Sequence, residues 1–119
     1  MQEQLKKRTK GIAIEVIKLI DELPEKASAW VIAKQILRCS TSIGSNYRAA
    51  CRAKSAADFI HKLKIVEEES DETLYWLEIL EESNLVTSKR IEKIKKEVDE
   101  ILSILVSSIK TLKAKQQRN

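Results

Sequence analysis

The chain has 119 residues, of which 34% are charged and 4% aromatic, and its 22 Lys and Arg exceed its 18 Asp and Glu. This length allows one hydrophobic core, which excludes a catalytic domain joined to an accessory domain. Two glycines and one proline among many good helix formers predict an all-α protein. Because we find neither a membrane-spanning apolar stretch nor a signal-peptide pattern, we expect a soluble, cytoplasmic protein with no membrane partner.

Two helices are predicted in the N-terminal half. The first covers about residues 4–22, where apolar side chains recur at helical spacing until Pro24 closes the segment. The second covers about residues 28–53, and Ser28 is its predicted N-cap. The inward face of this second helix is built from small residues, Gly44 among them, so we expect a neighbouring helix to approach it closely.

A third helix is predicted over about residues 55–83. Ser55 followed by Asp58 is a helix-start pattern, because both side chains can bond to the free amide groups of the first turn. The apolar stripe of this helix passes through a polar middle, where Ser70 and Thr73 occupy stripe positions. We therefore expect a buried polar layer within an otherwise aliphatic core.

The fourth predicted helix covers about residues 87–113, where apolar residues alternate at three and four positions as in a bundle seam. Asn84 suits the C-terminal cap of the preceding helix, and the polar tail 113–119 is expected to fray. Short connections between four helices predict one domain over residues 1–119, an antiparallel up-down-up-down four-helix bundle.

The residues with the most reactive side chains do not form a recognisable active site. Cys39 and Cys51 are twelve positions apart on one predicted helix, roughly 18 Å, which excludes an intrachain disulfide between them. Asp58 and His61 match half of a di-iron pattern, but His61 is the only histidine of the chain. Acidic residues at consecutive helical positions spread around the helix. We therefore predict no catalytic residues, no metal site and no cofactor, and expect a protein that is not an enzyme.

The second helix has a stripe of cations along its outer face. On a helical wheel Lys34, Arg38, Arg48 and Arg52 lie within about 40° of one direction, opposite the small-residue face, with hydroxyl side chains between them. Such a stripe suits contact with a phosphate backbone, so these four are the predicted nucleic-acid-binding residues. The alternative is that they pair with acidic residues of the third helix, in the same chain or in a neighbouring subunit, or are simply solvated.

Charge is unevenly distributed along the chain, which keeps both interpretations open. Residues 1–54 carry 11 Lys and Arg against 5 Asp and Glu, residues 55–86 carry 2 against 9, and residues 87–119 carry 9 against 4. The acidic third helix can therefore neutralise its basic neighbours within the bundle or across subunits. The second hypothesis is accordingly a protein–protein assembly adaptor.

Several motifs together resemble a known family. They are Gln35-Ile36-Leu37-Arg38, the segment Ser40-Thr41-Ser42-Ile43-Gly44-Ser45-Asn46, Ala53-Lys54-Ser55, Asp58-Phe59, and the stretch 69–80 with its Tyr75-Trp76-Leu77. Over about residues 10–110 the chain resembles the bacterial four helix bundle proteins, also called 23S ribosomal RNA intervening-sequence proteins. Many members continue after the Asn with Ile-Ala-Glu-Gly, whereas this chain has Tyr47-Arg48-Ala49-Ala50, which places a cation where others have an acid.

The resemblance implies a four-helix bundle that assembles as a ring-shaped homopentamer with a basic surface. Some members are encoded inside intervening sequences of large-subunit ribosomal RNA genes. Related accessory proteins of diversity-generating retroelements bind nucleic acid and a reverse transcriptase. The expected partners are therefore a second copy of the chain, RNA or DNA, and a protein such as a reverse transcriptase, and the resemblance brings no catalytic residues with it.

Overall fold

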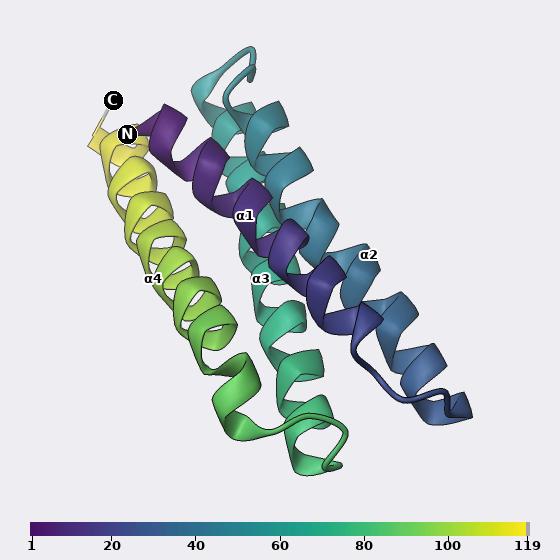
Figure 1. Cartoon of the computed structure of the whole chain (residues 1–119). Helices are drawn as coiled ribbons and strands as arrows, with labels where there is room; N and C mark the ends of the chain where they lie inside the picture. The colour runs from purple at the N-terminus through teal and green to yellow at the C-terminus, as the bar shows by residue number, and fades with distance from the viewer. Residues whose placement is uncertain (119) are drawn as a thin grey trace.

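A computed structural model, which describes residues 1–118, confirms the all-α, antiparallel up-down-up-down bundle (Figure 1). The bundle is elongated, with extents of 54 × 22 × 21 Å. Its elements are α1 (Gln2–Asp21), α2 (Ala27–Ala50), α3 (Ala56–Glu82) and α4 (Ser88–Arg118).

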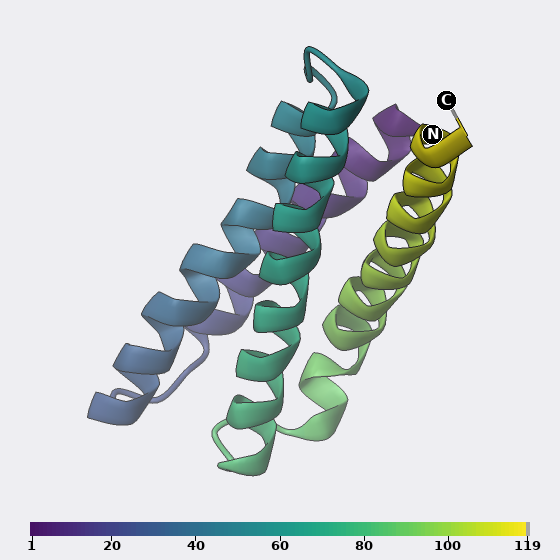
Figure 2. The same ribbon diagram turned by 180° about the vertical axis from the view of Figure 1, so that it is seen from behind.

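Each helix packs against two others: α1 and α3 both contact α2 and α4. The groove between α1 and α2 therefore lies on the opposite side of the bundle from the groove between α3 and α4. In Figure 1 α3 lies behind α1, and in Figure 2, which views the molecule from behind, α3 lies in front. The start of α1, the α2–α3 connection and the end of α4 lie at the same end of the bundle (Figure 1).

The core consists of aliphatic side chains from all four helices and includes the predicted polar layer. Ser70 and Thr73 are fully buried. Each hydroxyl donates to a carbonyl of its own helix, and the Thr73 Oγ1 also lies 3.3 Å from the Cys39 Sγ. Cys39 is buried, Cys51 is half-buried and both thiols are free, which confirms the prediction that they do not pair. The polar layer is thus satisfied internally.

The predicted cap and the predicted end of the second helix are wrong. The helix begins at Ala27 behind Lys26, which has an extended backbone and no side-chain cap bond, so Ser28 lies inside the first turn and does not cap it. The helix ends at Ala50, and Arg52 lies in the turn that follows, where its amide donates to the Ala49 carbonyl.

Both ends of α3 follow the expected capping chemistry, and a threonine caps the start of α4. The Ser55 Oγ accepts the amide of Asp58 at 3.1 Å. Asn84 has φ 62°, the left-handed conformation that closes a helix, and the Thr87 Oγ1 accepts the amide of Arg90 at 3.1 Å. The last helix continues to Arg118, five residues beyond its predicted end, and Asn119 lies outside the described residues.

Gly44 lies where α1 crosses α2. A Cβ built on Gly44 would lie 3.4 Å from the backbone nitrogen of Lys10 and from the carbonyl carbon of Thr9. The backbone of α1 thus reaches van der Waals contact with α2, which confirms the close approach expected from the small residues of this face.

Candidate nucleic-acid interface

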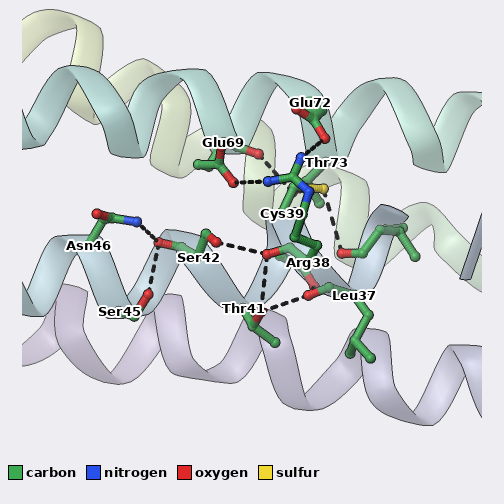
Figure 3. A network of polar contacts seen from close by, with 12 residues as sticks. Leu37, Arg38, Cys39, Thr41, Ser42, Ser45, Asn46, Glu69, Glu72 and Thr73 are labelled. Atoms are coloured by element: carbon green, nitrogen blue, oxygen red, sulfur yellow. Dashed lines mark hydrogen bonds and ion pairs between the residues drawn. The ribbon is translucent and has the colours of Figure 1, made fainter. Parts of the chain in front are cut away.

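The four cations predicted to bind nucleic acid are all exposed on the outside of the α2 segment, but they point to different neighbours. Arg38 reaches α3, where its guanidinium donates to the carboxylates of Glu69, at 3.3 Å, and Glu72 (Figure 3). The hydrogen bond with Glu72 raises the pKa of Arg38. This is the intramolecular pairing named as an alternative above, so the charge of Arg38 is largely balanced within the chain.

Lys34 lies beside an aromatic and apolar surface. Its ammonium group is 4.6 Å from the ring centroid of Trp30, a cation–π geometry, and Trp30 is 64% exposed. Trp30, Ile20 and Leu37 help to line a groove of about 370 Å³ between the end of α1 and the start of α2. The surroundings of Lys34 therefore differ in chemistry from those of the arginines.

Arg48 and Arg52 line a groove of about 640 Å³ on the α1–α2 side of the bundle, together with Lys6, Lys7 and Lys10 of α1. One carboxylate, that of Glu3, also lines it and bonds to Lys6 at 3.1 Å. Within residues 1–118 no acidic side chain forms an ion pair with the other four cations. These five residues, Lys6, Lys7, Lys10, Arg48 and Arg52, are called the basic groove below.

The hydroxyl groups of α2 are already engaged. Thr41 donates to the carbonyl of Leu37 at 2.7 Å, and Ser45 donates to that of Ser42 at 3.3 Å (Figure 3). Both side chains line the basic groove. Because their protons are donated to the helix backbone, the donors that remain for an anion in this groove are the cationic side chains.

The basic groove belongs to a larger basic end of the molecule. The fold brings together residues 1–10, 48–64 and 106–118, which carry 13 Lys and Arg against 2 Asp and Glu. The rest of the chain carries 9 Lys and Arg against 16 Asp and Glu. The bundle therefore has one strongly positive end and a negative remainder, a field that attracts polyanions to the positive end.

The sequence model of a family described as 23S rRNA-intervening sequence protein matches residues 2–107. The chain belongs to this family. The family predicted from the motifs of α2 and α3 is thereby confirmed.

One solved structure similar to this family member is described as a protein with unknown function from the S23 ribosomal protein family of Bacteroides thetaiotaomicron VPI-5482. The two chains are 39% identical, the match covers 92% of this chain and 97% of the other, and the TM-score is 0.84. No curated protein matches the chain.

Three groove residues of this family member, Lys6, Lys7 and Lys10, were not singled out from the sequence. The sequence does contain two features that point to these lysines: the basic run 6–10 and the small residues of the second helix. A helical wheel describes one helix alone, so it does not show which residues of a neighbouring helix lie beside it. Gly44 brings α1 close enough for the lysines of α1 to share a groove with Arg48 and Arg52.

The residues weighed for other chemistry have ordinary structural roles. The carboxylate of Asp58 accepts bonds from the Lys62 ammonium at 2.8 Å and from the Lys54 amide at 3.2 Å, and these bonds lower its pKa. Over the described chain there is no group of three or more His, Cys, Asp and Glu residues placed to hold a metal ion. Among the same residues, no helix has the length and apolarity needed to cross a membrane.

Proposed function

We propose that this protein is a non-enzymatic, cytoplasmic bundle that binds the phosphate backbone of structured RNA or DNA through the basic groove. The observation that carries the proposal is the convergence of Lys6, Lys7, Lys10, Arg48 and Arg52 in one groove with a single carboxylate. Four of these cations, all except Lys6, form no ion pair within residues 1–118, so a phosphate that binds them displaces no carboxylate. Compared with the four-residue stripe expected from the sequence, the proposed site keeps Arg48 and Arg52 and adds the lysines of α1.

Both the chemistry of the groove and the name of the family support a nucleic acid. Arginine presents a planar set of donors that matches phosphate oxygens, and lysine adds charge without fixed geometry. Trp30, the exposed ring beside Lys34, is the one aromatic bordering this side of the described bundle, too few rings for a stacking path along a single strand. Contact with the backbone of a duplex is therefore favoured over base reading. The family name, 23S rRNA-intervening sequence protein, points to the same class of partner.

The test is the binding of a fluorescein-labelled RNA hairpin, and of the corresponding DNA hairpin, measured by anisotropy at several salt concentrations. In the triple variant Lys10→Gln, Arg48→Gln, Arg52→Gln we expect affinity to fall at least about tenfold. We expect the slope of log affinity against log salt to become shallower by roughly two to three, since each lost phosphate contact removes about one.

A matched control removes the same number of charges elsewhere. Lys89, Lys93 and Lys96 are exposed cations in the first half of α4, far from the positive end, and their triple Gln variant should bind with nearly unchanged salt slope. Arg38→Gln should also leave the slope unchanged, because its charge is balanced by Glu69 and Glu72. An equal loss in the groove and control variants would show that net charge alone drives binding, and the groove assignment would fail.

A second candidate function is assembly, and the outer face of α3 supports it. Glu68, Asp71, Glu78 and Glu82 are exposed and form no ion pair within residues 1–118, and Tyr75 among them is 55% exposed. This acidic face is complementary in charge to the basic groove of another copy, which makes a homo-oligomer such as the pentamer implied by the resemblance a reasonable assembly. The same face could receive a basic protein partner, such as a reverse transcriptase.

Native mass at low and high salt tests this candidate. If the groove of one copy holds α3 of the next, raising salt should dissociate the oligomer, and Arg48→Glu with Arg52→Glu should give monomers. Adding Glu78→Lys and Glu82→Lys to that variant should restore assembly by reversing both sides of the contact. A mass that is the same for all these proteins would refute pairing between groove and α3.

A further inference from the structure

A second groove lies on the same side of the bundle as the basic groove. It is the groove of about 370 Å³ between the end of α1 and the start of α2, and most of its lining is apolar, including Ile20, Leu23, Trp30 and Leu37. We call it the apolar groove. Leu37 lines this groove and Thr41, one helical turn later on α2, lines the basic groove. The two grooves therefore follow one another along the α1–α2 side (Figure 1).

The apolar groove contains a large aromatic surface that the chain itself does not bury. Trp30 is 64% exposed. The Lys34 ammonium lies over its ring, 4.6 Å from the centroid, and so covers one of the two ring faces. The other face is available to a flat ligand that stacks on it, and the aliphatic lining of the groove adds apolar contact to the same ligand.

Two charged side chains border this apolar surface. Glu25 and Lys34 both line the groove and are exposed, and within residues 1–118 neither forms an ion pair. The ammonium group suits a phosphate, and the carboxylate accepts hydrogen bonds from the amino group of a base edge. The groove thus offers one group for each part of a nucleotide: a ring for the base face, an acceptor for the base edge and a cation for the phosphate.

The spacing of the two grooves fits a ligand that is part duplex and part single strand. Lys34 and Arg48 are both on α2, and the 14 residues between these positions span about 21 Å. A stacked strand advances about 3.4 Å per nucleotide, so about six nucleotides cover this span. Bases within a duplex are paired and cannot stack on Trp30, whereas a nucleotide beyond the end of the duplex can. One ring is enough for one such base.

We propose that the apolar groove binds one unpaired nucleotide, which adjoins the duplex held in the basic groove. The proposal rests on the nucleic-acid-binding function proposed above and deepens it, because it makes the ligand a junction between duplex and single strand. Trp30 stacks on the base, Lys34 contacts its phosphate and Glu25 accepts a bond from its edge. Lys34, which lies apart from the arginines, thereby has a role in the same interface.

The experiment uses the full chain and three fluorescein-labelled RNA duplexes, with binding measured by anisotropy. One duplex is blunt, one has a single-stranded extension of six nucleotides, and one has an extension of six abasic residues, which keeps the phosphates and removes the bases. Both extensions are made at the 5′ end and at the 3′ end. For at least one end we expect the wild-type protein to bind the extension with bases about fivefold or more tightly than the abasic one.

Variants at the apolar groove assign that preference to single residues. Trp30→Ala should bind the two extended duplexes equally and the blunt duplex as the wild-type protein does, and Trp30→Phe should keep part of the preference because it keeps a ring. Lys34→Gln should bind both extended duplexes roughly threefold more weakly and leave the blunt duplex unaffected. Tyr75→Ala is the matched control, since it removes another exposed ring from α3, and it should keep the full preference.

The outcomes separate this proposal from the proposed function. A wild-type protein that binds no duplex would overturn both. Binding of the blunt duplex without a preference for bases over abasic residues would overturn the nucleotide site and leave the basic groove standing. A preference that survives in Trp30→Ala would also overturn the site, because the base would then stack elsewhere. A native mass of Trp30→Ala below that of the wild-type protein would assign the ring to a contact between copies, with the same consequence.

Discussion

Gly44 determines how closely α1 and α2 approach, and so how close the lysines of α1 lie to Arg48. At 3.4 Å from the α1 backbone, the Cβ of alanine just fits, and alanine gains about 1 kcal/mol of helix propensity over glycine. Leucine would overpack the crossing at a cost of about 1–3 kcal/mol. In urea unfolding we therefore expect Gly44→Ala to be as stable as the wild-type protein or more stable, and Gly44→Leu to be clearly less stable.

Gly11 is the matched control for Gly44, because it is the other glycine of the chain and also lies inside a helix. A Cβ built there meets no atom within 4 Å, so Gly11→Ala and Gly11→Leu should both raise the free energy of unfolding. If leucine were tolerated equally well at positions 44 and 11, the close crossing of α1 and α2 would be disproved. Reduced RNA binding by Gly44→Leu alone would link the crossing to the basic groove.

At the scale of the elements, Arg8 ties α1 to α4, two helices that no loop connects. Its guanidinium lies 2.7 Å from one carboxylate oxygen of Glu97, 3.0 Å from the other, and 2.9 Å from Glu100. The hydrogen bond from Arg8 lowers the pKa of Glu97. A carboxyl whose pKa is lowered by folding adds stability above its unfolded pKa, about 4.5 here, and loses it as pH falls through the folded value.

We therefore expect Arg8→Gln to lower the free energy of unfolding at pH 7 by about 1 kcal/mol or less, since both side chains are about one third exposed and water weakens the pair. The difference from the wild-type protein should shrink below pH 4.5 as Glu97 is protonated. Chemical unfolding at a series of pH values measures this difference in the free energy of unfolding between the variant and the wild-type protein. A difference that stays constant down to acid pH would mean that Arg8 acts through packing of its carbon chain instead of through its charge.

The helices themselves could be predicted because local chemistry specifies most of their ends. The cap at Ser55 and the helix end at Asn84 both depend on groups within a few residues along the chain. At the helix end, the amide of Leu85 donates to the carbonyl of Leu80, and the amide of Asn84 donates to the carbonyl of Glu81. Ser28 shows the limit, because a cap is selected by backbone conformation and here Lys26 has the extended one. Side-chain preference favours Ser28 as the cap, but it does not reveal that the backbone already enters the helix two residues earlier, after Lys26.

At the scale of the whole molecule, the candidate site could be predicted only in part, because it belongs to no single helix. The wheel of α2 placed Arg38 and Arg48 about 80° apart, and that difference is enough to direct one to α3 and the other towards α1. How the four helices pack determines which helix lies beside each face of α2, and the sequence of α2 alone does not show it. The effect of Lys64 in lowering the pKa of Lys113 likewise joins residues of two helices, α3 and α4, and depends on their packing.

A molecule with one strongly positive end should be less stable without its ligand than its packing allows, because cations from all four helices repel each other there. Lys113 lies at this end and its pKa is lowered by the charge of Lys64, so we expect Lys113→Gln to raise the melting temperature of the free protein at low salt. The gain should vanish near 1 M salt, where the screening length is about 3 Å.

Heparin, a polyanion, should raise the melting temperature of the wild-type protein more than that of the variant, because binding relieves repulsion that the variant lacks. Melting curves followed by circular dichroism measure all three effects. If Lys113→Gln left the melting temperature unchanged at low salt, repulsion between Lys64 and Lys113 would contribute nothing to the stability of the free protein.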